Sequence, residues 1–422
     1  MLLSKFGEKF TCHSGILSLM DDLGNALAGN DHMIMMGGGN PAHIPEMEDI
    51  FRQRLQCILD SRNQFSRLIG TYDPPAGDQD FCRELAAMLR RRFGWKLTAR
   101  NICLTQGSQT AFFMLFNILG GPTRSGQKRR IQLPLAPEYI GYSDCGIGEE
   151  LFAAERPDIE EIDAHTFKYH VNFDALNVNR DTAALCISRP TNPTGNVLTD
   201  GELERLNALA KEHDIPLIID GAYGLPFPEL IFTEATPHWD EHVILCLSLS
   251  KLGLPALRTG IVIACEEVIA AVSAMNAITS LAPNSVGAMV TVDMIRDDSI
   301  MTMSQTIIRP WYEERLAFAC REFKRALGEE LPWAMHKPEG AMFLWLWFRD
   351  LPITSLALYE RLKQRGVLVV SGHYFFPGLK EEWQHRHECL RVTYTRDQDT
   401  VRRGIDIIAE EVRKAYSETL TK

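Results

Sequence analysis

Short apolar runs alternate with helical patterns between residues 102 and 264, and this alternation constrains the fold more than any other feature of the chain. The apolar runs lie at residues 102–105, 131–135, 181–188, 215–220, 243–247 and 260–264. Helical patterns lie at 47–59, 81–93, 111–119 and 203–213. Strands that alternate with helices form βαβ units, in which helices cover both faces of a mostly parallel sheet. We therefore predict an α/β fold.

The pattern changes after residue 264. A long helical stretch runs to residue 325, with breaks near Pro283 and Pro310, because proline interrupts the backbone hydrogen bonds of a helix. Apolar runs then return at 340–348, 366–370 and 390–394. A chain of 422 residues is long enough for one large α/β domain with a smaller one attached. We predict an N-terminal arm and part of the small domain at 1–50, a large domain at 51–295 and a small C-terminal domain at 296–422.

The composition narrows the functional classes. Hydrophobic residues make up 45% of the chain and charged residues 23%, as in ordinary globular proteins. A net charge of −11 opposes non-specific attraction to nucleic acid or to an anionic membrane. No apolar run is long enough to span a bilayer, and the N-terminus lacks the pattern of a secretory signal. The ten cysteines include no Cys-x-x-Cys pair, which suits reduced thiols, so we expect a cytoplasmic protein.

The pattern points to Lys251 as a candidate reactive residue. It follows the apolar run 243–247, so it should emerge at the carboxyl end of a buried strand, where open α/β sheets bind ligands. A partly desolvated lysine loses its proton more readily, and its neutral amine can form a Schiff base with an aldehyde. Ser248, Ser250 and Arg258 are nearby donors for a phosphate. The alternative is a solvated lysine in a βα loop.

Four other residues fall on the same sheet edge. Gly107 opens the helical pattern at 111–119, and a helix start of this kind suits phosphate, although it also serves as a plain turn. Asn192 lies in a loop of turn-forming residues after the run 181–188, while Asp220 ends the run 215–220 and Tyr223 follows it. The order of the strands therefore places these residues and Lys251 on one rim.

Taken together, these segments resemble the pyridoxal-phosphate-dependent aminotransferases of fold type I, the aspartate aminotransferase-like superfamily. Five signatures appear in the order of that family. They are Gly107-Ser108-Gln109, Asn192-Pro193-Thr194-Gly195, Asp220 with Tyr223, Ser248-Leu249-Ser250-Lys251 with Arg258, and Arg391. The resemblance implies a large cofactor-binding domain with a mostly parallel seven-stranded sheet flanked by helices, and a smaller α+β domain.

The resemblance also implies roles for these residues with pyridoxal 5'-phosphate as the cofactor. Lys251 would hold the cofactor as a Schiff base and move a proton at the substrate α-carbon. Asp220 would pair with the pyridine nitrogen, and Asn192 and Tyr223 would donate hydrogen bonds to the phenolic oxygen. The remaining cofactor contacts would come from Gly107, Ser108, Gln109, Tyr139, Ser248, Ser250 and Arg258, with Tyr139 stacked on the ring.

The substrate and the second subunit would be bound by other residues. Arg391 matches the arginine that binds the substrate carboxylate, and its alternative is a surface charge after a strand. Gly38 and Gly39 match a loop that closes over the substrate. Tyr72 matches a tyrosine that reaches the phosphate of the neighbouring subunit, which implies a homodimer with shared sites. Ala256 replaces the more usual glycine near Arg258, so the geometry of that loop stays open.

We therefore expect a ping-pong transfer of an amino group between small aliphatic amino acids and 2-oxo acids. Valine and alanine are the expected donors, with pyruvate and 3-methyl-2-oxobutanoate as acceptors. The same anchor residues also serve alanine or aromatic aminotransferases, carbon–sulfur lyases and cyclopropane-carboxylate synthases, and a cofactor-sensing regulator is a further alternative. We expect no metal, because the histidines of 385–389 lack the spacing of a zinc motif.

Overall fold

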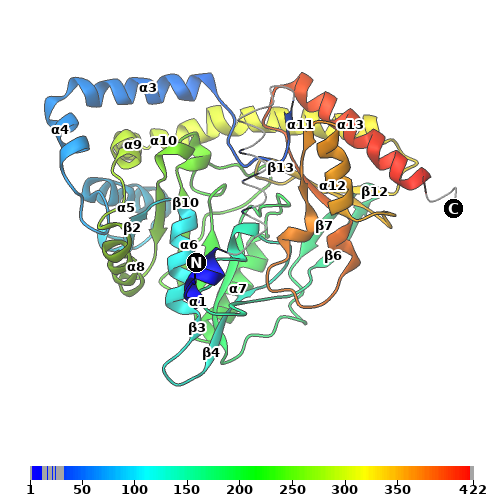
Figure 1. Ribbon diagram of the computed structural model, residues 1–422. Helices are drawn as coiled ribbons and strands as arrows, with labels where there is room; N and C mark the ends of the chain where they lie inside the picture. The colour runs from blue at the N-terminus through cyan, green and yellow to red at the C-terminus, as the bar shows by residue number, and fades with distance from the viewer. Residues whose placement is uncertain (1, 12–16, 18–20, 22–23, 25–32, 419–422) are drawn as a thin grey trace.

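The computed structural model of this chain describes residues 2–11, 17, 21, 24 and 33–418. The rest of the predicted N-terminal arm lies outside the described residues. Two large sheets, each packed with helices, make up the described part, and the long helices α3 (Pro45–Asp60) and α11 (Arg309–Leu327) run along one side of the molecule (Figure 1). The predicted α/β class is confirmed.

The larger sheet has eight strands in the described part of the chain, in the order β2-β11-β10-β9-β8-β4-β3, with β5 also paired to β4. Their bounds are β2 Ile102–Thr105, β3 Gly121–Pro122, β4 Lys128–Leu133, β5 Phe152–Ala154, β8 Thr182–Ser188, β9 Leu217–Asp220, β10 Val243–Ser248 and β11 Gly260–Ile263. Strands β5, β4, β8, β9 and β10 are parallel to one another, while β11 is antiparallel to β10 and β2, and β3 is antiparallel to β4. The six predicted runs are confirmed as strands, and without the two-residue β3 the sheet has the predicted seven.

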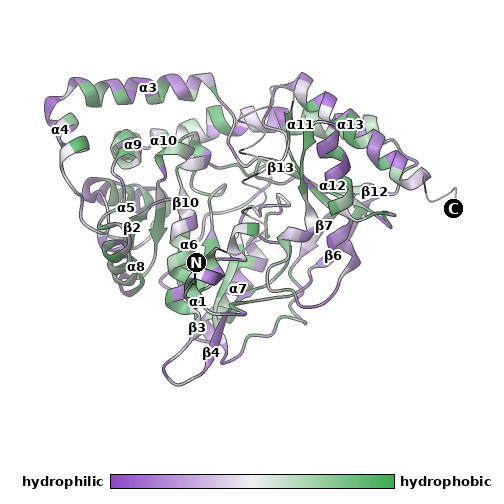
Figure 2. Cartoon of the chain, viewed as in Figure 1, coloured by the Kyte–Doolittle hydropathy of each residue, from purple (hydrophilic) through white to green (hydrophobic). Residues whose placement is uncertain are grey.

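Every residue of β2, β8, β9, β10 and β11 is buried. Burial on both faces explains why these strands are continuous apolar runs rather than alternating ones. The helices of this part are α4 Arg62–Gly70, α5 Gln79–Phe93, α6 Ser108–Leu119, α7 Asp200–Glu212, α8 Glu266–Ser280 and α9 Val286–Arg296. Figure 2 shows the hydrophobic colour concentrated on the central strands and on α6.

The second sheet has six strands within the described residues, in the order β15-β16-β13-β12-β7-β6. Their bounds are β6 Asp158–Asp163, β7 Thr166–His170, β12 Trp333–His336, β13 Phe343–Phe348, β15 Val370–Ser371 and β16 Cys389–Thr393. Strands β6 and β7 come from the middle of the chain, which the sequence did not indicate because β6 is acidic and exposed. The predicted strand at 366–370 is two short strands, since β14 (Val367–Leu368) pairs with β1 (Ile34–Met35) instead. The domain boundaries at 50 and 295 stay a prediction.

The predicted helical stretch to residue 325 consists of α8, α9, α10 (Ser299–Met303), a π-helical turn (Ser304–Ile308) and α11. Pro310 lies in the first turn of α11, directly after the π-helical turn, so the helical hydrogen-bond pattern changes next to a residue that has no backbone N–H. The sequence did not predict two helices, α12 (Ser355–Gln364) and α13 (Gln398–Ser417); α12 packs against β15 of the second sheet, and α13 packs against α11 and α12. Among the helices described, none combines the length and the apolar character needed to cross a bilayer.

The register of the larger sheet gathers loops at one edge. Asp220 at the end of β9 is level with Ser188 on β8 and with Cys246 on β10. On the antiparallel side, Gly260 at the start of β11 is level with Thr105 at the end of β2. The segments after β2, β8, β9 and β10 therefore leave the sheet at the same edge, which is the edge predicted to bind a ligand.

We predict that Gly260→Ala destabilises the protein. A Cβ at Gly260 would lie 2.5 Å from the carbonyl carbon of Gly107 and 2.6 Å from the amide nitrogen of Ser108, so the start of α6 would have to move. Overpacking of this kind costs about 1–3 kcal/mol of unfolding free energy. Urea unfolding followed by circular dichroism measures it. Gly201→Ala is the matched control, because a Cβ at Gly201 on α7 meets nothing within 4 Å and alanine favours helix. Equal urea midpoints for Gly260→Ala and the wild type would contradict the prediction.

Candidate active site

A cavity of about 530 Å³ opens at this edge of the larger sheet and reaches the second sheet. It is lined by most of the residues that the sequence singled out, from segments more than 350 positions apart. These are Gly38, Gly39, Ser108, Gln109, Tyr139, Asn192, Asp220, Tyr223, Ser248, Ser250, Lys251, Arg258 and Arg391. Their functional roles stay predictions, but the fold brings the side chains together.

Lys251 follows β10 in a short 3₁₀ helix (Ser250–Leu252), so it does emerge at the carboxyl end of a buried strand. Its Nζ donates to the carbonyl oxygen of Gly39 at 2.5 Å. Burial, together with the positive charges of Arg391 and Arg258, lowers the pKa of Lys251 to about 7. A large fraction of the amine is therefore neutral near neutral pH, and the neutral amine is the nucleophilic form.

Asp220 is the buried acid of the cavity, with 8% of its surface exposed. Its Oδ2 accepts a hydrogen bond from the Tyr142 hydroxyl at 2.7 Å, and its Oδ1 accepts one from the Ala222 amide at 2.9 Å. Burial raises the pKa of Asp220 to about 6, although these two hydrogen bonds and the charge of Lys251 act in the opposite direction. A protonated nitrogen placed beside Asp220 would compensate for the lost hydration of the carboxylate.

The start of α6 forms one end of the cavity. Gly107 precedes the helix with φ +90°, and no side chain caps the helix there. The amides of Ser108 and Gln109 therefore lack an intrahelical acceptor, as at any helix start. A Cβ at Gly107 would clash with the guanidinium of Arg258, so that arginine lies directly against the turn. Amide N–H groups, a helix dipole and a guanidinium together suit a phosphate.

The loop that carries Arg258 answers the question raised by Ala256. Ala256 lies inside a short 3₁₀ helix (Pro255–Leu257) and does not have a positive φ. The left-handed conformation falls on Arg258 itself, at φ +43°. Nη1 of Arg258 approaches the Ser250 hydroxyl at 3.4 Å, while the Ser248 hydroxyl accepts from the Ser250 amide at 3.1 Å. The alanine is therefore compatible with an arginine at the phosphate end.

Arg391 lies on β16 of the second sheet and is buried, with 3% of its surface exposed. Its guanidinium carbon lies 4.2 Å from the ring centre of Phe343 and 5.1 Å from that of Phe375. Nη1 donates to Asn192 Oδ1 and Nη2 to the Gly37 carbonyl, both at 2.7 Å, whereas its buried Nε has no partner among the described residues. A planar cation with a spare N–H beside a cavity is suited to bind a carboxylate.

Two tyrosines and a glutamine complete the wall. Burial raises the pKa of Tyr139 to about 12 and also raises the pKa of Tyr223, so both phenols remain hydrogen-bond donors at neutral pH. Gln109 donates from Nε2 to the Gly141 carbonyl at 2.8 Å, which holds the loop bearing Tyr139 against α6. The Gln109 Oε1 atom is buried and has no partner in the described part of the chain.

Two of the predicted residues do not line the cavity. Gly107 directly precedes Ser108, which does line the cavity, and Tyr72 has 83% of its surface exposed on the loop after α4. Sequence reasoning also missed Tyr142, the partner of Asp220, and Glu138, which accepts from the Ser188 amide at 2.8 Å. Burial raises the pKa of Glu138 to about 8. The one sequence signal for Tyr142 was its spacing from Tyr139, because residues three apart in a helical turn share a side.

The residues present fit pyridoxal phosphate, an aldehyde with a pyridine nitrogen and a phosphate. The uncapped helix start beside Arg258 suits the phosphate, buried Asp220 suits a protonated ring nitrogen, and neutral Lys251 suits the aldehyde. No metal-binding group of three or more His, Cys, Asp or Glu side chains occurs among the described residues, and His385 instead contacts the hydroxyl of Tyr169.

Comparison with protein families gives a match to the model for aminotransferases of class I and II over residues 52–408. The chain is also 49% identical to the valine–pyruvate aminotransferase of Escherichia coli K12 over 419 residues, which cover 99% of this chain and 100% of that protein. Both matches extend across the two sheets and every residue that lines the cavity from Ser108 to Arg391.

Solved structures agree with this match. A protein of Psychrobacter arcticum 273-4 superposes with a TM-score of 0.96 at 46% identity, covering 99% of both chains. The valine–pyruvate aminotransferase of Salmonella typhimurium LT2 superposes with a TM-score of 0.88 at 48% identity, covering 96% of this chain and 100% of that one. An aspartate aminotransferase of Thermus thermophilus, at 21% identity and a TM-score of 0.75, shares the fold.

We predict that Lys251 reacts with amine-specific reagents at lower pH than other lysines. Its pKa of about 7 means that the neutral amine dominates above that pH, whereas exposed lysines titrate near roughly 10.4. Protein freed of small molecules is labelled across a pH series with a small acylating reagent, and peptide mass spectrometry follows each lysine. Labelling of Lys251 should be half-maximal near pH 7. Lys211, which is 44% exposed on α7, is the internal control. A midpoint for Lys251 above about pH 9 would contradict the lowered pKa.

Proposed function

Because the chain belongs to the class I and II aminotransferases, we propose that it transfers the amino group of L-valine to pyruvate, giving 3-methyl-2-oxobutanoate and L-alanine. The full-length identity of 49% to a valine–pyruvate aminotransferase carries this choice of substrates. The reaction alternates two half-reactions at one site, so donor and acceptor use the same cavity in turn. Apolar side chains of Met35, Pro41, Ala42 and Ile140 line that cavity, which suits small aliphatic substrates.

The family uses pyridoxal phosphate, and we propose that the cavity holds it through residues described above. Lys251 would bind it covalently, Asp220 would accept from its ring nitrogen, and Asn192 and Tyr223 would contact its phenolic oxygen. The phosphate contacts would come from Gly107, Ser108, Gln109, Ser248, Ser250 and Arg258, with Tyr139 against the ring. When bound, the cofactor supplies an aldehyde that links to an amine and a ring that withdraws electrons from the substrate α-carbon.

In the proposed mechanism, Lys251 Nζ would take the proton from the α-carbon of the substrate and would deliver it to the former aldehyde carbon of the cofactor. An amine with a pKa of about 7 can perform both transfers near neutral pH, because neither its neutral nor its protonated form is strongly favoured. The negative charge of Asp220 would keep the ring nitrogen of the bound cofactor protonated. Tyr142 donates to Asp220 and so fixes the orientation of the carboxylate.

We propose that Arg391 binds the α-carboxylate of either substrate. Its guanidinium lies against the rings of Phe343 and Phe375, so its plane is fixed before a substrate arrives. Asn192 Oδ1 already accepts from Arg391, which leaves the amide N–H groups of Asn192 as the donors toward a second partner. Gly38 and Gly39 line the same part of the cavity and would cover the bound substrate.

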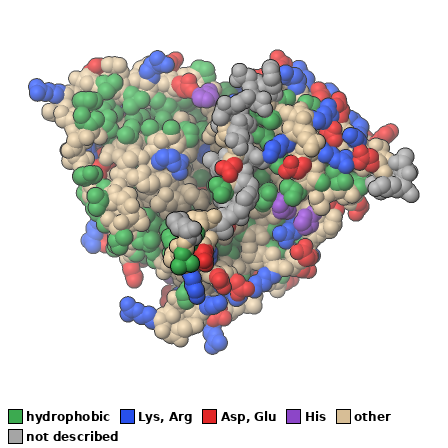
Figure 3. Space-filling view, viewed as in Figure 1, with side chains coloured by type: hydrophobic (Ala, Val, Ile, Leu, Met, Phe, Trp, Pro, Cys, Tyr) green, Lys and Arg blue, Asp and Glu red, His purple; other side chains and the backbone are tan. Residues whose placement is uncertain are grey.

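We also propose a homodimer in which Tyr72 reaches the phosphate of the partner. Tyr72 follows a row of exposed apolar side chains on α3 and α4, namely Leu55, Leu59, Phe65 and Ile69, with 37–69% of their surfaces exposed. Figure 3 shows apolar side chains gathered over these two helices. A continuous apolar patch on a protein of this kind marks an interaction surface.

We further propose a cytoplasmic location, because the nine described cysteines are free thiols.

We predict that Lys251→Ala abolishes alanine-dependent formation of valine from 3-methyl-2-oxobutanoate. The wild type should carry a cofactor that absorbs visible light, and coupled detection of pyruvate measures turnover. Lys211→Ala is the control and should retain full activity, because the Lys211 side chain is 44% exposed on α7. Transamination by the Lys251→Ala protein would overturn the mechanism.

A screen of amino donors tests the substrate pair separately. Valine and alanine should exceed aspartate and glutamate by at least about tenfold in kcat/KM, because acidic side chains pair poorly with an apolar wall. Arg396 also lines the cavity, so acidic donors belong in the screen. A preference for aspartate or glutamate would overturn the substrate assignment. Release of pyruvate from a sulfur-containing amino acid without any acceptor would indicate a lyase instead.

We predict that Ile69→Glu dissociates the dimer. A carboxylate at this position, 69% exposed on α4, would be buried without a partner if α4 lies in the interface. Light scattering after gel filtration should give about half the wild-type mass, and the variant should lose cofactor more readily. Ile162→Glu is the matched control, because Ile162 is 45% exposed on β6, outside the patch. An unchanged mass for Ile69→Glu would contradict the proposed interface.

A further inference from the structure

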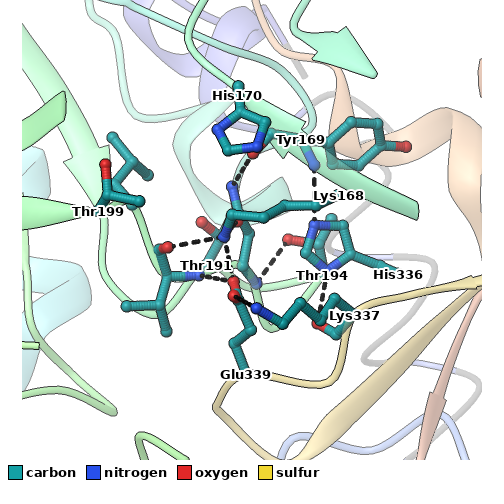
Figure 4. A network of polar contacts seen from close by, with 12 residues as sticks. Lys168, Tyr169, His170, Thr191, Thr194, Thr199, His336, Lys337 and Glu339 are labelled. Carbon is teal, nitrogen blue, oxygen red and sulfur yellow. Dashed lines mark hydrogen bonds and ion pairs between the residues drawn. The ribbon is translucent and has the colours of Figure 1, made fainter. Parts of the chain in front are cut away.

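A buried ion pair lies behind the cavity, outside the residues that line it. Lys168 on β7 and Glu339 after β12 form the pair, and each has 4% of its surface exposed. Lys168 Nζ also donates to Asn196 Oδ1 and to the Val197 carbonyl, both at 3.0 Å. All three donors of the ammonium are therefore used, as Figure 4 shows for the contacts around Lys168.

Glu339 is equally well supplied with partners. Its Oε2 accepts from Lys168 and from the Val197 amide at 3.2 Å, and its Oε1 pairs with Lys337 Nζ at 3.0 Å (Figure 4). Burial raises the pKa of this carboxyl, but the charge and hydrogen bond of Lys168 outweigh it and leave the pKa of Glu339 lowered. Glu339 is therefore held as a carboxylate, and the hydrogen bonds of both side chains are satisfied.

These contacts join the second sheet to one loop at the cavity, residues 189–198. Asn196 in that loop donates from Nδ2 to the Tyr169 carbonyl at 3.2 Å, next to Lys168 on β7. Gly195 has φ +71°, and a Cβ there would lie 2.6 Å from the carbonyl oxygen of Gly340. The loop therefore touches β7 and the segment after β12 at three consecutive residues, Gly195 to Val197.

The same loop carries Asn192, four residues before Asn196. The Gly195 amide donates to the Thr191 carbonyl and the Thr191 amide to the Asn196 carbonyl, both at 2.8 Å. Asn192 is thus enclosed in a turn whose far end is fixed by Lys168 and Glu339. On its cavity side, Asn192 Oδ1 accepts from Arg391 at 2.7 Å. Movement at one end of this short turn must move the other.

His336 reinforces the connection between β7 and β12. Its Nε2 accepts from the Tyr169 amide at 3.1 Å, and its Nδ1 lies 2.8 Å from the Lys337 carbonyl, which identifies Nδ1 as the protonated nitrogen. Figure 4 shows this ring beside Lys168. The two segments that carry Lys168 and Glu339 are therefore held together independently of the loop 189–198.

We propose that the Lys168–Glu339 ion pair positions the Asn192 turn, and through it the guanidinium of Arg391, for binding of the substrate carboxylate. The proposal rests on the proposed function for the role of Arg391. A buried ion pair contributes little net stability compared with apolar residues of the same size, so its value here lies in fixing geometry. Lys168 and Glu339 touch neither substrate nor cofactor and act only through the turn.

The test compares three variants in the holoenzyme. Lys168→Met removes the ammonium but leaves Glu339 paired with Lys337, so the protein should still fold. Glu339→Gln keeps an acceptor for Lys168 and Val197 and should give a smaller effect. Lys211→Met is the matched control, because Lys211 pairs with Asp240 at 2.7 Å on the exposed surface of α7.

The first measurement is hydrogen exchange of backbone amides, which does not depend on activity. In Lys168→Met, peptides covering 189–198 should exchange roughly tenfold faster or more, while peptides of α13 stay unchanged. The second measurement is steady-state kinetics with alanine. Misplaced supporting residues typically cost about 10- to 100-fold, so kcat/KM should fall by that factor, mainly through a higher KM.

The outcomes separate the two proposals. Uniformly faster exchange with unchanged kinetics would reduce Lys168 to a structural residue and overturn the positioning role. Unchanged exchange at 189–198 would overturn it as well. A wild type that transaminates neither alanine nor valine would overturn the proposed function, while the exchange measurement would still decide whether the ion pair holds the turn.

Discussion

Loss of hydration at the carboxyl edge of the larger sheet is the constraint on which the rest of the site depends. Removal of water disfavours the charged form of any group, so the same burial lowers the pKa of Lys251 to about 7 and raises that of Asp220 to about 6. Both groups are thereby brought near the working pH from opposite sides. The fully buried strands β9 and β10 create this environment, because they place both residues at the end of a continuous apolar layer.

Much of this arrangement follows from local sequence. Buried parallel strands are continuous apolar runs, so six of the eight strands of the larger sheet, and the residues at their ends, could be predicted before any contact was known. That is why Lys251 and Asp220 were placed correctly on one edge. The start of α6 could also be predicted, because Gly107 interrupts an apolar pattern directly before a helical one.

What the sequence could not give depends on contacts between distant segments. Tyr142 bonds to Asp220 across 78 positions, and Lys168 bonds to Glu339 across 171. Strand β6 is acidic and exposed, so no apolar pattern marked it or its membership of the second sheet. Local propensity decides elements, whereas partners of this kind are decided by topology, which is why the predicted site lacked the residues that hold it in place.

Arg391 shows how such supporting contacts produce recognition. Two of its nitrogens donate to Asn192 and to Gly37, so the guanidinium is held against the rings of Phe343 and Phe375 without its full set of acceptors. The buried Nε has no partner among the described residues, so no hydrogen bond offsets the free energy that it loses on leaving water. A carboxylate that accepts from Nε removes that cost without breaking either existing bond, because each terminal nitrogen has a second hydrogen to offer. The site thus favours a ligand with a planar anion, and the rigidity of the Asn192 turn determines how closely that anion is oriented against Lys251.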